Sequence, residues 1–273
     1  MTDRYAVFGN PIAHSKSPQI HAMFAEQFGL DMTYTAELLE LENFQTQADH
    51  YFKNGLRGAN VTVPFKLDAL DFAKQRGGLS ERAALAGAVN TLIRTNAGIQ
   101  GDNTDGAGII RDITQNIGFN IKDKQVLVLG AGGAVRGIMK PLMDCKPKHV
   151  VIANRSEPRA MALANDFGAC GHGFPDIKAL PFDLIINGTS ASLSGDVPPI
   201  PLETVAKHTY VYDMMYAAEP TSFLSWASTH SNHLFDGLGM LVEQAAESFE
   251  LWTGHKPKTQ PVIQALRDQL SEA

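Results

Sequence analysis

Three glycines at the end of an apolar run form the clearest candidate binding site in this sequence. Residues 126–129 are Val-Leu-Val-Leu, typical of a strand buried on both faces of a parallel sheet, and Gly130, Gly132 and Gly133 follow. Apolar residues then recur at helical spacing, so a helix should begin within the glycines. The unpaired N–H groups and dipole of a helix N-terminus attract anions. The pattern predicts a dinucleotide pyrophosphate site, the alternative being a tight turn without a ligand.

The residues after the next predicted strand indicate which dinucleotide would bind. An NAD site places Asp or Glu about 20 residues after the glycines, for the ribose hydroxyls. Here the chain has Asn154, Arg155 and Ser156, with Arg159 close behind. Guanidinium groups and a hydroxyl suit the 2′-phosphate of NADP through charge-assisted hydrogen bonds. We therefore predict NADP, and the alternative is a solvated helix cap that binds nothing.

Polar residues in the first half suggest a second site. Ser15 and Ser17 alternate before a predicted helix and could present hydroxyls to a carboxylate, although Ser17 followed by Pro18 is also an ordinary N-cap. Lys66 follows a predicted strand at its carboxyl end, where open α/β sheets bind ligands. A lysine there is also typical of a solvated surface charge.

Two further groups of polar residues stand at element ends. Strand alternation sends Asn60 and Thr62 to one side of the strand predicted at 58–63. Asp102 and Asp105 lie in a short turn before a predicted helix, which is more polarity than a helix cap requires. Gln244 lies at the flank of an apolar helical stripe, where it could equally be an ordinary boundary residue.

Strands and helices alternate along the whole chain, which predicts the α/β class. The first hundred residues repeat strand and helix and predict a parallel-type layer, followed by a hairpin turning at 96–98. The second part contains the βαβ unit with the glycines and is expected to form a doubly wound parallel sheet. The expected strands are 5–8, 33–38, 58–63, 91–94, 126–129, 149–153, 183–187, 210–213 and 233–235. The expected helices are 18–28, 41–52, 107–117, 134–143, 158–167, 240–252 and 261–270.

Composition excludes several classes of protein. The 273 residues are 44% apolar and 19% charged, with a net charge of −6, which disfavours nucleic-acid and anionic-membrane partners. No apolar run has membrane-span length, and the N-terminus lacks signal-peptide features, so we expect a cytoplasmic protein. Two cysteines without CxxC spacing and no HExxH motif predict free thiols and no metal. The sequence does not report the oligomeric state, and a homodimer is left open as an expectation.

Eight motifs in order resemble the shikimate dehydrogenase family over essentially the whole chain. They cover residues 9–18, 58–66, 86–91, 101–106, 130–134, 154–159, 211–216 and 236–246. The resemblance implies reversible reduction of 3-dehydroshikimate to shikimate by NADPH, in the pathway to aromatic amino acids. It also implies a discontinuous α/β substrate domain, 1–105 plus 241–273, and a Rossmann-type NADP domain, 106–240.

The resemblance also implies residue roles. Lys66 and Asp105 are similar to the family's catalytic pair, which suits a reaction whose developing alkoxide needs a proton donor. Ser15, Ser17 and Tyr216 should hold the substrate carboxylate, and the ring hydroxyls should bind Asn60, Thr62, Asn90, Asp105 and Gln244. The cofactor should contact Gly130, Ala131, Gly132, Gly133, Ala134, Asn154, Arg155, Ser156, Arg159, Met214 and Gly237, with Thr189 and Ser190 nearby.

Two residues depart from common family patterns. Val135 stands where a small or hydroxyl residue is frequent, and Gly188 where alanine is usual. Neither removes a ligand group, so only fine cofactor geometry is in doubt. Three other functions remain open: an NAD-linked quinate/shikimate dehydrogenase, a non-catalytic NADP-sensing module, and another two-domain NADP dehydrogenase acting on a small carboxylated alcohol.

Overall fold

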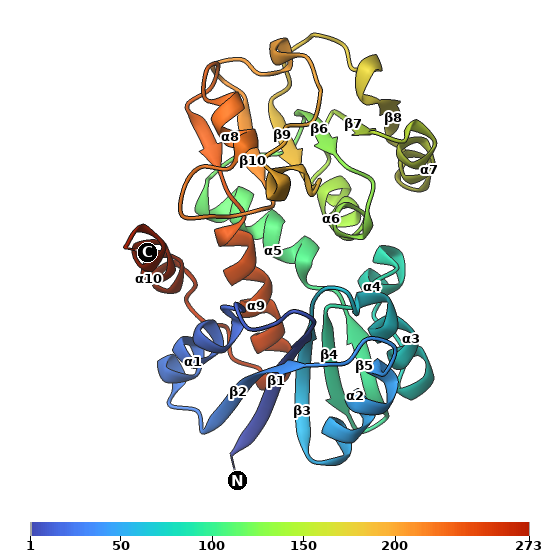
Figure 1. Ribbon diagram of the computed structural model, residues 1–273, viewed down its shortest axis with the longest axis vertical. Coiled ribbons are helices and arrows are strands. Elements are labelled where there is room, and N and C mark those ends of the chain that lie inside the picture. Colours follow the sequence, from blue (N-terminus) through green and yellow to red (C-terminus); the bar gives the residue numbers. More distant parts are fainter. Residues whose placement is uncertain (1, 273) are drawn as a thin grey trace. The chain divides into compact units, whose positions relative to one another are not determined.

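The computed structural model describes residues 2–272, and the chain divides into two compact units (Figure 1). The first unit comprises 1–108 and 242–262, and the second 109–241 and 263–273. Residues 263–273 thus group with the second unit, whereas the sequence-based division assigned them to the substrate domain. One reason is an ion pair within the second unit, in which the Arg267 guanidinium donates to both carboxylate oxygens of Asp236 at 2.7 and 2.6 Å. The sequence-based boundaries remain a prediction about functional domains.

The first unit contains a mixed five-stranded sheet with the order β2-β1-β3-β4-β5. β2, β1 and β3 are parallel, whereas β4 pairs antiparallel with both β3 and β5. The expected parallel-type layer is therefore limited to β2, β1 and β3. The hairpin expected at 96–98 joins β4 and β5 as an antiparallel pair, and β4 also runs antiparallel to β3, which was not expected. The strands are β1 Asp3–Gly9, β2 Met32–Leu38, β3 Leu56–Val61, β4 Thr91–Thr95 and β5 Gly98–Asp102.

Helices cover both faces of this sheet. Along β1, Ala6 and Phe8 belong to the core formed with α2 and α3, while Tyr5 points to the other face and stacks on Trp252 of α9. The helices of this unit are α1 Ser17–Phe28, α2 Phe44–Lys53, α3 Lys66–Arg76 and α4 Glu81–Ala86. The chain crosses between the units within α5 Asp105–Arg111, α9 Leu238–Thr253 and α10 Gln260–Ser271.

Three local expectations in the first unit were wrong. α3 and α4 were not predicted, because α3 is rich in charge and buries only a narrow stripe containing Phe72, and α4 is a short helix capped by Ser80. Ser17 is the first helical residue rather than the cap, since Lys16 occupies the N-cap position. β3 ends at Val61, so Thr62 lies beyond the strand.

The second unit is a six-stranded sheet with the order β11-β10-β9-β6-β7-β8, and all its pairings are parallel. This order, extending outward in both directions from β6, is the doubly wound Rossmann topology, which confirms the predicted fold class. β8 escaped prediction because its sequence, Cys-Gly-His-Gly, has no apolar alternation. The strands are β6 Gln125–Leu129, β7 His149–Asn154, β8 Cys170–Gly173, β9 Leu184–Asn187, β10 Tyr210–Asp213 and β11 His233–Phe235.

Two apolar cores lie on opposite faces of this sheet. Val126 and Val128 of β6 pack with α6 and α7, and Leu127 and Leu129 pack in the core that contains α8. All four side chains are fully buried, as predicted for a strand covered on both faces. The helices are α6 Gly133–Asp144, α7 Glu157–Phe167 and the unpredicted α8 Ser222–Ala227. A π-helix, Asp112–Asn116, continues α5, and single 3-10 turns span Phe174–Asp176, Ala191–Ser194 and Leu202–Thr204.

Candidate active site

A lysine and an aspartate form an ion pair in the first unit. Lys66 Nζ lies 2.5 Å from Asp105 Oδ2, and the two side chains are 29% and 12% exposed. Lys66 is the first residue of α3, following β3, and Asp105 is the first residue of α5, following β5. Two residues that the sequence separates by 39 positions are thus brought together. Asp105 is buried, whereas the Lys66 ammonium remains partly open to solvent and can exchange a proton with a ligand.

Asn90 fixes the carboxylate of this pair. Its side-chain Nδ2 donates to Asp105 Oδ1 at 2.8 Å and to Thr104 Oγ1 at 2.9 Å, while its Oδ1 accepts from the Thr104 backbone N–H at 2.8 Å. Asn90 is only 2% exposed. Because each carboxylate oxygen has its own partner, Lys66 on one side and Asn90 on the other, the Asp105 carboxylate is held in one orientation.

Asn60 connects the sheet to the substrate-site candidates around it. Its Nδ2 donates to Ser248 Oγ at 2.9 Å and to Thr91 Oγ1 at 3.2 Å, and its Oδ1 accepts from the Tyr34 hydroxyl at 2.7 Å. The amide protons are therefore used inside the protein, and the carbonyl oxygen is the atom with capacity for a ligand hydroxyl. Burial raises the pKa of Tyr34 well above its usual value, although a side-chain hydrogen bond with Ser17 acts in the opposite direction and lowers the pKa.

The remaining candidates of the N-terminal segment lie near the start of α1 and the end of β3. Ser15 Oγ accepts from the Ser17 backbone N–H at 3.3 Å, and Ser15 is half-buried whereas Ser17 is buried. Thr62 is half-buried, and its backbone N–H donates to Phe8 O at 2.9 Å. Thr62 thus extends the β1–β3 pairing past the end of the strand.

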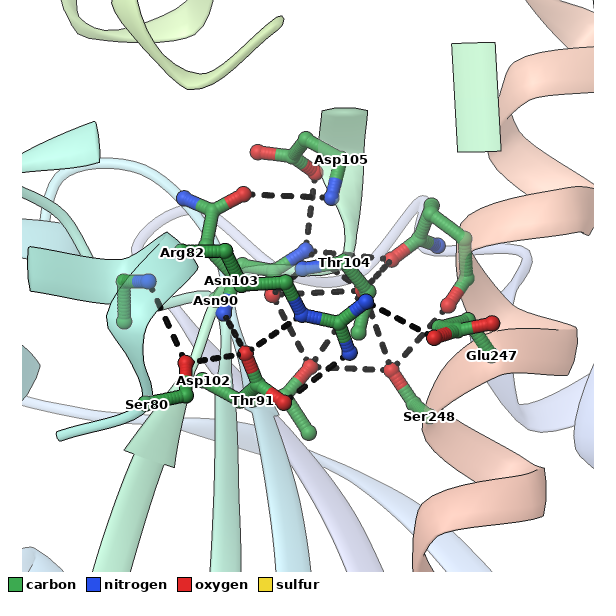
Figure 2. A network of polar contacts seen from close by, with 12 residues as sticks. Ser80, Arg82, Asn90, Thr91, Asp102, Asn103, Thr104, Asp105, Glu247 and Ser248 are labelled. Atoms are coloured by element: carbon green, nitrogen blue, oxygen red, sulfur yellow. Dashed lines mark hydrogen bonds and ion pairs between the residues drawn. The ribbon is translucent and has the colours of Figure 1, made fainter. Parts of the chain in front are cut away.

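α9 completes the polar network of this unit (Figure 2). Gln244 Oε1 lies 3.4 Å from both Asn90 Nδ2 and Thr104 Oγ1, and Ser248 Oγ lies 2.9 Å from Thr91 Oγ1. Thr91, Thr104 and Ser248 are fully buried polar residues to which sequence reasoning gave no site role. Ser248 carried one usable signal, since it is a hydroxyl within an otherwise apolar helical stripe.

In the second unit, the glycine turn between β6 and α6 provides an open cradle. Gly130 has a φ of 107°, which favours glycine, and its N–H donates to Ala153 O at 2.7 Å. Gly132 is the N-cap of α6, and a Cβ added at Gly132 or Gly133 would meet no atom within 4 Å. Ala134 is likewise exposed and Ala131 half-buried. Open backbone at the N-terminus of a 12-residue helix fits a pyrophosphate.

The end of β7 carries the residues predicted to select the nucleotide. Asn154 is the last residue of the strand, and its Nδ2 donates to Ser156 O at 3.1 Å. Arg155 and Arg159 are exposed, and Ser156 is the N-cap of α7. No carboxylate stands at the strand end itself, so the residues present fit a 2′-phosphate better than a free ribose hydroxyl.

The carboxyl ends of β9 and β10 are joined by a buried carboxylate, Asp213. It accepts from Ser192 Oγ at 2.7 Å, Thr221 Oγ1 at 2.6 Å and the Met215 N–H at 3.1 Å. Asn187 Nδ2 donates to the same carboxylate at 3.2 Å. Asp213 was not among the predicted residues, although it belongs to the motif at 211–216.

These strand ends bring together the other predicted cofactor residues. The Thr189 hydroxyl donates to Asn187 Oδ1 at 2.7 Å, and the exposed Ser190 follows it. A Cβ at Gly237 would lie 2.2 Å from Met214 O, so only glycine allows this approach. Tyr216 is half-buried, and burial raises its pKa, helped by the negative charge of Asp236.

Within residues 2–272, His, Cys, Asp and Glu nowhere gather in a group of three or more that could hold a metal ion. Of the helices in that same range, none combines the length and apolarity needed to cross a bilayer.

Three family models match the chain. They are the shikimate dehydrogenase substrate binding domain over 7–92, the shikimate / quinate 5-dehydrogenase over 112–194 and the shikimate 5'-dehydrogenase C-terminal domain over 237–267. They cover most of both units.

Full-length relatives are similar throughout. Shikimate dehydrogenase (NADP(+)) of Hahella chejuensis is 50% identical, over 97% of this chain and 98% of that protein, and its namesake from Cellvibrio japonicus is 51% identical, over 100% and 99%. The Thermus thermophilus shikimate 5-dehydrogenase crystallised with NADP(H) and shikimate has a TM-score of 0.88 at 34% identity, covering 98% of this chain and 100% of that one. An Ael1 enzyme from Pseudomonas putida has a TM-score of 0.92 at 40% identity, covering 97% and 98%. This chain belongs to the shikimate dehydrogenase family.

Proposed function

We propose that the chain catalyses the reversible, NADP-dependent reduction of 3-dehydroshikimate to shikimate, with Lys66 and Asp105 handling the proton. The observation that carries this proposal is the 2.5 Å contact between Lys66 Nζ and Asp105 Oδ2, in a unit matched by the family's substrate-binding model. NADPH supplies the hydride when bound. The protein's own task is to deliver a proton to the ketone oxygen as that oxygen becomes an alkoxide.

Lys66 is the proton donor in the reductive direction. Its ammonium gives one Nζ proton to the substrate oxygen, so an O–H bond forms as an N–H bond breaks, and the neutral amine is then reprotonated from water. The 29% exposure of the side chain supports this last step. Asp105 orients the ammonium and stabilises its charge, and Asn90 keeps the carboxylate in place at 2.8 Å. In the oxidative direction the neutral amine removes the hydroxyl proton.

The other polar residues bind the substrate in this proposal. Ser15, Ser17 and Tyr216 hold its carboxylate, and the ring hydroxyls bind Thr62, Asn90, Asp105 and Gln244. Asn60 contributes through its carbonyl oxygen, since its Nδ2 already donates to Ser248 and Thr91. The glycine turn binds the pyrophosphate, and Asn154, Arg155, Ser156 and Arg159 surround the 2′-phosphate. Thr189, Ser190, Met214 and Gly237 line the remaining cofactor site.

Two alternative functions are separated by direct assays. An NAD-linked quinate/shikimate dehydrogenase would have a higher kcat/KM with NADH than with NADPH, which the arginines at the end of β7 argue against. A non-catalytic NADP-sensing module would bind NADPH without oxidising it in the presence of 3-dehydroshikimate. It would have no need of a paired Lys66 and Asp105.

The deciding experiment replaces the proton donor. Lys66→Ala should lower kcat by about 100- to 10,000-fold, because general acid catalysis is lost, while the Kd for NADPH stays unchanged. NADPH absorbance follows turnover with 3-dehydroshikimate, and fluorescence titration follows binding. Lys74→Ala, at an exposed position on the same helix, is the matched control and should behave like the wild type. Undiminished turnover in Lys66→Ala would show that the proton comes from another group.

The cellular setting is part of the same proposal. A cytoplasmic enzyme acting on a small molecule agrees with the free thiols Cys145 and Cys170, since an exposed thiol suits a reducing compartment. The net charge of −6 argues against a nucleic-acid partner. Cell fractionation would test the location, and sedimentation equilibrium would distinguish a monomer from a homodimer.

A further inference from the structure

Three charged side chains from separate elements meet beside the loop that carries Asp105. Arg82 comes from α4, Asp102 is the last residue of β5, and Glu247 comes from α9 (Figure 2). Arg82 Nη1 lies 2.7 Å from Glu247 Oε1. The proposed function gives these residues no role, and the three positions are distant in sequence.

Arg82 holds Asp102 in a fork. Its Nε lies 2.7 Å from Asp102 Oδ1 and its Nη2 lies 2.9 Å from Asp102 Oδ2. Ser80 Oγ donates to the same Oδ1 at 2.5 Å, and so does the Asn103 backbone N–H at 2.7 Å. A bidentate guanidinium fixes the plane of a carboxylate as well as its position, and Asp102 is only 5% exposed.

The surroundings of the Arg82 guanidinium favour its charged form. Burial alone would lower the pKa of Arg82, but the hydrogen bonds and charges of Asp102 and Glu247 raise it overall. The guanidinium therefore stays charged across the working range of a protein.

Asp102 and Asp105 lie three residues apart in the same loop, and hydrogen bonds along this loop link the position of Asp102 to that of Asp105. Its backbone carbonyl accepts from the Asn90 N–H at 3.1 Å, next to the Asn90 amide that holds Asp105. The Asn103 side chain donates to Ala88 O at 3.0 Å and accepts from the Asp105 N–H at 3.2 Å. The loop is thus pinned at its start by Arg82 and at its end by Asn90 and Asn103, which leaves the Asp105 carboxylate little freedom.

We propose that Arg82 is a positioning residue for the Lys66–Asp105 pair, acting through Asp102 to set the loop that presents Asp105. The inference rests on the proposed function, since it concerns the same proton-handling pair. A role confined to stability explains the arrangement less well. Partly buried ion pairs contribute little net stability, because desolvation offsets the attraction, whereas a fork gives directional control.

The test compares Arg82→Gln and Arg82→Lys with Arg57→Gln. The control breaks the exposed Arg57–Asp3 ion pair of the same unit and should leave kcat unchanged. The kcat of Arg82→Gln, expressed per NADP⁺-binding site, should be about 10- to 100-fold lower than that of the wild type, because a small displacement of a catalytic group lowers the rate by about this much. Arg82→Lys, which keeps the charge but not the fork, should be intermediate. The Kd for NADP⁺ should not change, and a crystal structure of Arg82→Gln should show Lys66 and Asp105 out of contact.

Asp102→Asn tests the route of action independently and preserves the size of the side chain if Arg82→Gln folds poorly. The double variant Arg82→Gln/Asp102→Asn should be no slower than the slower single variant, because both remove one interaction. Multiplicative losses would overturn the route through Asp102. The inference fails if Arg82→Gln keeps kcat within about twofold of wild type per binding site while Lys66→Ala is inactive. An active Lys66→Ala would instead refute the proposed function.

Discussion

The two departures from the family pattern, Val135 and Gly188, lie against each other, and this contact makes a quantitative prediction. A Cβ at Gly188 would lie 2.5 Å from Val135 Cγ2 and 2.9 Å from Met214 Sδ. Gly188 does not have a positive φ, so its backbone accepts alanine, and the obstacle is steric. Methionine adapts, but a fully buried β-branched valine in a helix has one preferred rotamer. The valine therefore occupies the space that an alanine methyl at 188 would need.

Gly188→Ala should lower the free energy of unfolding by about 1–3 kcal/mol, the usual result of overfilling a close-packed core. Val135→Ala removes two buried methyl groups at about 0.8 kcal/mol each, so with its cavity it should lose about 2 kcal/mol. The double variant should be no less stable than either single one, because the new methyl enters the vacated space. The coupling energy should therefore be about 2 kcal/mol in favour of the double variant.

Urea unfolding followed by circular dichroism measures these four stabilities, and NADP⁺ titration reports the cofactor turn. Gly133→Ala serves as a control for stability alone, since a Cβ there meets no atom within 4 Å, and it should cause no loss. Additive losses, with a coupling energy below about 0.5 kcal/mol, would refute the idea that the two residues compensate for each other.

Two further predictions concern pH and cofactor choice. Burial lowers the pKa of His21 from 6.5 to about 3, so the unfolded chain takes up the proton first; stability is full above pH 6.5 and falls towards pH 3. Between pH 7 and pH 5, the free energy of unfolding of the wild type should fall by about 2 kcal/mol more than that of His21→Phe, as measured by urea titrations. Equal decreases in the two proteins would contradict this prediction. In fluorescence titrations, Arg155→Gln should weaken NADP⁺ binding about 10- to 100-fold and leave NAD⁺ binding unchanged. The control Lys140→Gln, on α6, should change the binding of neither nucleotide. If Arg155→Gln weakened the binding of both nucleotides equally, the result would count against a 2′-phosphate site.

Local patterns were sufficient to predict the Rossmann sheet and its glycine turn. Four consecutive apolar residues ending in Gly130 describe a doubly covered strand, and both faces of β6 are indeed buried. The signal is local because strand burial and a positive φ depend on neighbouring residues. Elements without such a pattern, such as α3 and β8, were missed.

The polar network of the first unit depended on long-range contacts. Strand alternation placed Asn60 on the same face as Thr62, but it did not predict that the Asn60 amide donates to Ser248 and Thr91, 188 and 31 residues away. Arg82 had no signal at all in the sequence, because a guanidinium in a short helix is typical of a solvated surface. Its partner Glu247 lies 165 residues further along the chain.

The sequence by itself determined the fold class and the cofactor turn, because each depends on residue types at fixed short spacing. The candidate proton donor, Lys66, was named only by the resemblance of the surrounding motifs to the family. Only the tertiary structure decided which atoms of Asn60 and Asn90 are already bonded, that Asp105 meets Lys66 at 2.5 Å, and that Arg82 and Glu247 flank the same loop. The physical reason is that hydrogen bonds and ion pairs act over a few ångströms. They are therefore set by how the sheet and helices pack rather than by distance along the chain.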